Sequence, residues 1–134
     1  MEEQLHIKIF DKTYAVHFPT VDEFLQIEST KTSLAAGQYG QLVSARSRTA
    51  LMALDMIDAF STFFVLLPEL QSEKVLPADI NQLSPKQIGQ ILVAYKTQYF
   101  PWADKIMRDI ESQVREAQKA LIDAEQELKE EIGK

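Results

Sequence analysis

The sequence predicts a mainly helical fold with a small β part: an N-terminal β-hairpin packed on a helical bundle, followed by a long helix with a heptad repeat. Three observations predict it. Apolar residues alternate with other residues only between Leu5 and Phe18, which is the period of a strand. Capping and stop signals divide the next eighty or so residues into helices. From Met107 onward, apolar residues recur every seven positions, as in a coiled coil.

The hairpin is predicted from a turn between two alternating runs. A two-residue turn at Asp11-Lys12 would place Ile9 opposite Tyr14, Ile7 opposite Val16, and Leu5 opposite Phe18. A four-residue loop would keep the same faces and is left open. The other face would then pair His6 with His17. A lone two-stranded ribbon is marginal, so its apolar face must lie on helices or be extended by a strand of another chain.

Two helices are predicted after the hairpin. Thr20 and Glu23 have the spacing of a capping box, so a helix begins here and runs to about Ala36, where Gly37 provides a stop. A second, long helix is predicted from about Gln41 to Leu67, before Pro68. Its apolar positions cover most of its circumference, which is typical of the central helix of a bundle.

The rest of the first domain is less regular. Residues 69–83 are expected to be irregular, with a turn of helix near Asp79. Ser84, Pro85 and Gln87 then start another helix, as N-cap, first helical residue and capping amide. The segment Tyr99-Phe100-Pro101-Trp102 is expected to break or kink it. The predicted domains are therefore 1–100, the hairpin and bundle, and 101–134, the heptad helix.

The heptad helix carries a thin apolar seam surrounded by charged residues and glutamine. The seam consists of Met107, Ile110, Val114, Ala117, Leu121, Ala124 and Leu128. So narrow a stripe needs a partner to be buried. The helix could fold back as an antiparallel member of the bundle, self-associate, or bind another protein. Its alanines allow close approach but supply little burial, which favours a specific partner over strong self-dimerisation, and these seven residues are the predicted partner-binding surface.

Composition excludes several functional classes. The 134 residues are 46% hydrophobic and 25% charged, as in a globular protein, and the net charge of −6 disfavours nucleic acid and anionic membranes as partners. The absence of cysteine excludes disulfides and thiolate catalysis. The N-terminus lacks the features of a signal peptide, and the apolar stretch 59–67 is too short to span a bilayer. We therefore expect a cytoplasmic protein.

Two pairs of side chains could bind a metal or act in catalysis. His6 and His17 could share a metal across the hairpin, but no third ligand is evident, and exposed polar residues are the favoured interpretation. Asp55 and Asp58, one helical turn apart, could share a proton or bind a divalent cation. We favour ion pairs with Arg46, Arg48 or a lysine of a neighbouring helix.

Three further segments have structural explanations. The loop 37–40 contains two glycines but lacks the lysine and hydroxyl residue of a phosphate-binding loop, so a hinge is preferred. The segment 44–48 contains two arginines and could form a small basic patch, but arginines in an acidic protein are usually partners of surface carboxylates. The aromatic segment 99–102 could anchor a partner, but core packing is favoured. We predict no catalytic residue, no cofactor and no metal.

Four features follow one another in the first hundred residues: the opening hairpin 7–16, the segment 18–24, a helix with Ile27-Glu28, and a long apolar helix ending in Leu66-Leu67-Pro68. In this layout the chain resembles small tail-assembly chaperones of tailed bacteriophages and related virion-module proteins. The resemblance covers roughly residues 5–102 and leaves the heptad helix outside. It implies a non-enzymatic protein of the host cytoplasm, or of the virion, that binds the tape-measure protein or other tail proteins. No functional residue is carried over from the family.

The alternatives to this function are a structural subunit retained in the virion, a cellular helical adaptor, and an enzyme or small-ligand domain. The last would use Asp55 and Asp58 and predicts loss of activity or ligand binding, but not of folding, when both become asparagine. Homo-oligomerisation through the heptad helix is left open.

Overall fold

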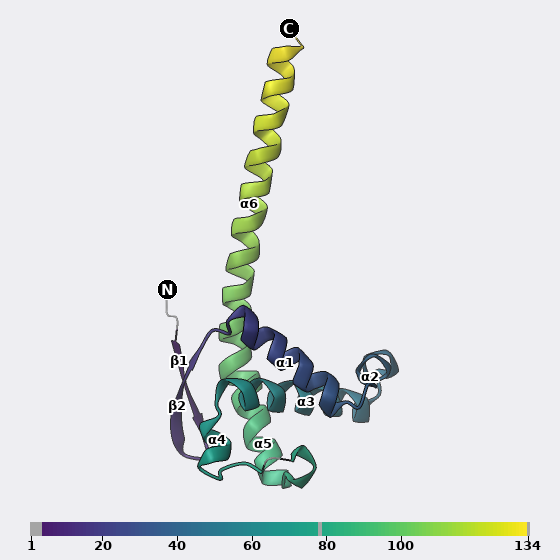
Figure 1. The fold of residues 1–134 in the computed structure, drawn as a ribbon, viewed down its shortest axis with the longest axis vertical. Helices are drawn as coiled ribbons and strands as arrows, with labels where there is room; N and C mark the ends of the chain where they lie inside the picture. Colours follow the sequence, from purple (N-terminus) through teal and green to yellow (C-terminus); the bar gives the residue numbers. More distant parts are fainter. Residues whose placement is uncertain (1–3, 78, 134) are drawn as a thin grey trace. The chain divides into compact units, whose positions relative to one another are not determined.

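The computed structural model describes residues 4–77 and 79–133. It is mainly helical with one two-stranded antiparallel hairpin, which confirms the predicted fold class (Figure 1). The chain divides into two compact units, Met1–Phe100 and Pro101–Lys134. Residues 1–3 and Lys134, where the predicted domains begin and end, lie outside the described residues. The elements are β1 (Gln4–Ile9), β2 (Lys12–His17), α1 (Val21–Leu34), α2 (Tyr39–Ala45), α3 (Arg48–Leu66), α4 (Glu69–Ser72), η1 (Ile80–Gln82), α5 (Pro85–Val93), η2 (Ala94–Tyr99) and α6 (Phe100–Ile132).

The hairpin forms, but the predicted register is wrong. Its two-residue turn is Phe10-Asp11, both with positive φ (52° and 65°), and not Asp11-Lys12. Strands β1 and β2 therefore pair Leu5 with Val16, His6 with Ala15, Ile7 with Tyr14, and Ile9 with Lys12. Phe18 lies beyond the strand and packs edge-on against Phe24, with ring centroids 5.6 Å apart. His6 and His17 share a face but are not opposite each other.

The faces of the hairpin were predicted correctly even though the register was not. Ile7, Ile9, Tyr14 and Val16 all lie on the buried face. Moving the turn by one residue shifts every cross-strand partner by two positions, and a shift of two leaves each side chain on its original face. The apolar alternation therefore specifies which side is buried and leaves the register to the turn.

Helix α1 begins with the predicted capping box. The Thr20 hydroxyl accepts from the Glu23 amide at 3.2 Å, and the Glu23 carboxylate accepts from the Thr20 amide at 3.0 Å. His17 Nε2 also donates to this carboxylate at 2.7 Å, which ties the end of β2 to the start of α1. The helix ends with Ala36 and Gly37 at positive φ, as the glycine predicted.

The Glu23 carboxylate gives this cap a pH dependence. Burial raises its pKa, but the hydrogen bonds from Thr20 and His17 outweigh burial and hold the pKa below its ordinary value of 4.5. A carboxyl group with a lower pKa in the folded state stabilises the fold above its unfolded-state pKa, and loses that contribution as pH falls through the folded-state pKa. Glu23→Gln keeps the capping hydrogen bond but cannot titrate. We expect its free energy of unfolding to fall less than that of the wild type between about pH 6 and about pH 3.

Urea unfolding of both proteins at the two pH values measures this difference. Glu116→Gln, at an exposed site on α6, is the matched control and should retain the wild-type pH dependence. A Glu23→Gln protein with the same pH dependence as the wild type would contradict the assignment.

The long helix predicted for residues 41–67 is two helices. Arg46 takes a left-handed conformation (φ 53°) that ends α2, and the Ser47 hydroxyl accepts from the Ala50 amide to cap α3. Apolar periodicity continues through this break because α2 and α3 each have an apolar face, so periodicity alone did not reveal the serine cap. The end of α3 before Pro68 is as predicted.

Helix α3 is the centre of the first unit, where it contacts α1, α2, α4 and α5. Ala59, Phe60, Phe63 and Leu66 form its buried side. Its first turns are more open than the sequence predicted, because Leu51 and Met52 are about half exposed. The hairpin packs by its apolar face, and β1 contacts η2.

The chain does not break at residues 99–102, since α5, η2 and α6 are consecutive helical segments, and α6 begins at Phe100, within the segment predicted to break or kink the helix. The segment η2 is π-helical, and the amide of Phe100 donates to the carbonyl of Tyr95, five residues earlier. Pro101 has no amide hydrogen and its ring would meet the carbonyl four residues before it in an α-helix. The wider π turn just before the proline accommodates that conflict without ending the helix.

Candidate functional site

The apolar seam lies on helix α6. All seven predicted residues fall within this one helix, on the face that a seven-residue repeat keeps aligned. Residues 107–128 span about 32 Å at 1.5 Å per residue. Among residues 101–133 the structure contains α6 alone, so the seam has no other element of its own unit to pack against. The exposed fractions are 43% for Met107, 47% for Ile110, 49% for Val114, 62% for Leu121 and 58% for Leu128.

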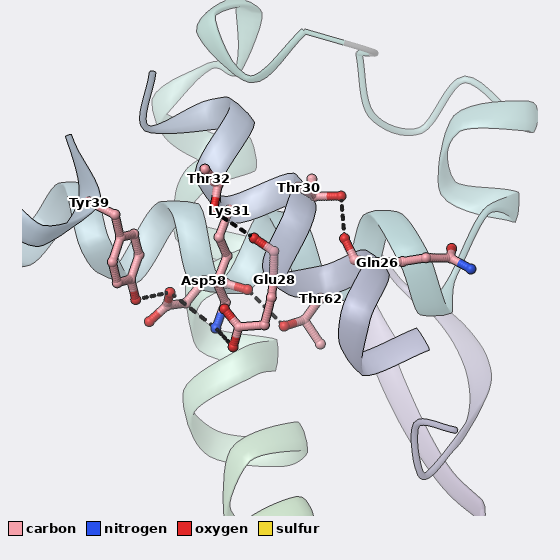
Figure 2. Close-up of polar contacts among 8 residues, drawn as sticks. All are labelled: Gln26, Glu28, Thr30, Lys31, Thr32, Tyr39, Asp58 and Thr62. Atoms are coloured by element: carbon pink, nitrogen blue, oxygen red, sulfur yellow. Dashed lines mark hydrogen bonds and ion pairs between the residues drawn. The ribbon is translucent and has the colours of Figure 1, made fainter. Parts of the chain in front are cut away.

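A polar cluster joins α1, α2 and α3 (Figure 2). The Tyr39 hydroxyl donates to Asp58 Oδ1 at 2.8 Å, and Lys31 Nζ lies 3.6 Å from the same oxygen and 3.6 Å from Glu28. The Thr62 hydroxyl donates to the Asp58 carbonyl. Burial and then the Asp58 carboxylate raise the pKa of Tyr39, so its phenol stays protonated and donates.

Asp55 and Asp58 form ion pairs with different lysines. Lys96 of η2 donates to Asp55 at 2.6 Å, while Asp58 is paired with Lys31 of α1. The predicted pairing with lysines of neighbouring helices is confirmed. The structure records these lysines, rather than Arg46 or Arg48, as the ionic partners in the described chain. Each carboxylate already accepts a hydrogen bond from another helical segment. The two aspartates therefore connect helices, which favours a structural role over catalysis or cation binding.

The two histidines are separated by the true register. His6 lies opposite Ala15, and His17 is bound to Glu23. In residues 4–77 and 79–133, no group of three or more histidine, aspartate or glutamate side chains is placed to hold a metal ion.

The aromatic residues before Pro101 contribute to the core and to the surface. The Tyr95 ring lies 6.0 Å from Phe63 and 5.6 Å from Tyr99, with which it is stacked. Burial raises the pKa of Tyr95 to about 12. The predicted core packing is confirmed for Tyr99, which is 6% exposed, whereas Phe100 is 51% exposed.

Gln98 is a residue that the sequence did not single out. Its side-chain amide accepts from the Lys8 amide at 2.8 Å and donates to the Lys8 carbonyl at 3.1 Å. It therefore occupies the outer edge of β1 at Lys8 in the way that a third strand would. Strand addition by another chain, which the lone hairpin suggested, is blocked at this point of β1. No sequence pattern pointed to this contact, because it joins residues ninety positions apart.

An open groove lies between α1 and the end of α3. Its volume is about 520 Å³. The exposed side chains of Leu25 and Phe64 border it, together with the hydroxyl residues Ser29 and Thr30. Nothing in the described residues indicates what would cover it, so the groove is a weaker candidate surface than the seam.

Helix α3 is, among the described residues, the one helix long and apolar enough to cross a membrane by length and composition. This helix has 19 residues and is therefore longer than the apolar stretch 59–67 that was considered too short to span a bilayer. Core helices of soluble proteins meet the same criteria, and 44% of the most apolar window is buried. Its contacts with α1, α2 and α5 give its apolar side chains a place in the core.

Comparison with known proteins adds no relative: no family model, curated protein or solved structure matches this chain.

Proposed function

We propose that this protein is a non-enzymatic binding factor that holds another protein by a helix–helix contact on the α6 seam, during assembly of a phage tail. The single observation that carries the proposal is the seam itself, seven aligned apolar or small side chains on a helix with no partner element in its described unit. A helix with one apolar stripe gains stability by burying that stripe on another helix. The phage assignment is supported by the resemblance of residues 5–102 to tail-assembly chaperones.

A single substitution in the seam should disrupt this contact. Leu121→Asp would place a charge in the buried stripe, where an unpaired carboxylate is strongly disfavoured. We expect binding to weaken by at least about thirty-fold, as for loss of an interface hot spot. Ile122→Asp is the matched control, because Ile122 is on the same helix and 54% exposed but lies outside the seam. The affinity of both variants is measured for the tail protein that a pull-down identifies.

Co-expression with the tail proteins encoded nearby, followed by a pull-down, identifies the partner. A complex that survives Ile122→Asp but not Leu121→Asp supports the proposal. Failure to form a complex with any tail protein would count against the phage assignment, and equal loss in both variants would count against the seam.

The alternatives are separated by other measurements. Mass spectrometry of purified virions distinguishes an assembly factor, which should be absent, from a structural subunit, which should be present. Light scattering of the full chain and of a chain truncated after Trp102 tests self-association. An unchanged oligomeric state and stability on truncation would show that α6 is neither an oligomerisation element nor part of the core.

A further inference from the structure

The positions beside the seam carry charge of one sign only. In a coiled coil these flanking positions lie closest to the partner helix and decide which partner is accepted. One flank consists of the residues that directly follow Ile110, Ala117 and Ala124, together with the equivalent residue one heptad earlier; these are Asp104, Glu111, Gln118 and Glu125. The other flank consists of the residues that directly precede Met107, Val114, Leu121 and Leu128; these are Ile106, Gln113, Ala120 and Glu127. Four of these eight residues are acidic and none is basic.

The basic residues of α6 lie outside both flanks. They fall at heptad positions that do not border the seam, namely Lys105, Arg108, Arg115, Lys119 and Lys129. One of them, Arg108, is paired with Asp104 at 2.8 Å, which offsets that flanking charge. Glu111, Glu125 and Glu127 are left as exposed carboxylates beside the seam, with no ion pair recorded for them in the described residues. We name these three the acidic flank.

We propose that the seam binds a helix of a different protein whose own flanking positions carry lysine or arginine. This inference rests on the proposed function and specifies the chemistry of its partner. Basic side chains opposite Glu111, Glu125 and Glu127 form attractive pairs along the edge of the interface, and acidic ones are repelled.

A second copy of this chain is a poor occupant by the same chemistry. Whether two copies of α6 align parallel or antiparallel, their flanks bring together only acidic, amide and apolar side chains. No attractive ion pair forms between the flanks, and Ala117 and Ala124 supply little burial to compensate. The charge pattern therefore selects a different protein over self-association.

Two synthetic helices test the charge preference directly. Both are about 28 residues long, four heptads, with leucine at every seam position; one has lysine and the other glutamate at every flanking position. Binding of each labelled peptide to the full chain is measured by fluorescence anisotropy at about 0.05 M and about 1 M salt. We expect the lysine peptide to bind about ten-fold or more tightly than the glutamate peptide at low salt. This ratio should shrink at high salt, where surface charges are screened.

A matched pair of triple variants separates the flank from overall charge. Glu111→Lys, Glu125→Lys and Glu127→Lys together reverse the acidic flank and should reverse the peptide preference. Asp109→Lys, Glu116→Lys and Asp123→Lys change the net charge equally but lie on the outer face, and should keep the wild-type preference. Circular dichroism confirms that both variants remain helical.

The outcomes distinguish this inference from the function on which it rests. Equal binding of the two peptides would overturn the charge inference while leaving the seam as a helix-binding surface. Binding of neither peptide would overturn the proposed function as well. Equal loss of preference in both triple variants would show a general charge effect and overturn the acidic flank. If the full chain is a dimer and Leu121→Asp makes it a monomer, the seam binds a second copy of this chain. That result would contradict the proposal.

Discussion

Replacing Phe63 with alanine is expected to lower the free energy of unfolding by about 3–5 kcal/mol. The ring is fully buried and meets Tyr95 and Tyr99 edge-on, with centroids 6.0 Å away in each case. Its removal leaves a cavity where α3 meets η2, and the stacked tyrosines lose the ring against which both pack. Urea unfolding followed by circular dichroism measures the loss.

The neighbouring residue provides the control for this prediction. Phe64 has the same side chain on the same helix but is 41% exposed. Phe64→Ala is expected to cost no more than about 1 kcal/mol, as for most surface substitutions. Similar losses at the two positions would mean that the buried side of α3 is assigned incorrectly.

A second large effect is expected at Ile7 of the hairpin. This side chain is completely buried and lies opposite Tyr14. Ile7→Ala should cost about 2–5 kcal/mol through lost burial and the cavity left behind. A two-stranded ribbon is marginal without a packed face, so amide hydrogen exchange in β1 and β2 should accelerate more than in α3.

His6→Ala is the matched control on the exposed face of the same strand. We expect a change within about 0.5 kcal/mol and no effect on strand exchange. If Ile7→Ala left exchange in β1 and β2 unchanged, the hairpin would not depend on its buried face.

Features that depend on nearby residues were predictable from the sequence. The capping boxes at Thr20 and Ser84 have the expected partners, Glu23 and Gln87, three residues later. The seven seam residues lie on one helix, α6, as the heptad repeat predicted, and their role in partner binding stays a prediction. The buried face of the hairpin was predicted for the same reason, since alternation has only two faces to choose from.

The errors occurred where two local solutions were nearly equivalent. Turns at Phe10-Asp11 and Asp11-Lys12 bury the same side chains, so the pattern could not choose between them. A continuous helix and a capped restart at Ser47 likewise share one apolar period. The segment around Pro101 was predicted to break or kink the helix; the chain does not break there, because the π-helical turn of η2 accommodates the proline.

The sequence predicted a lysine of a neighbouring helix as a partner of the aspartates, but not which distant residues meet. Lys96 reaches Asp55 across forty-one positions, and Gln98 reaches Lys8 across ninety. Several lysines and glutamines could have filled these roles, because charge and hydrogen-bonding capacity say nothing about which residues meet in space. The sequence therefore specifies the faces of the helices and strands and the pattern of the α6 seam. The partners of Asp55, Asp58 and the β1 edge depend on how those faces pack, because packing alone determines which polar groups come within bonding distance.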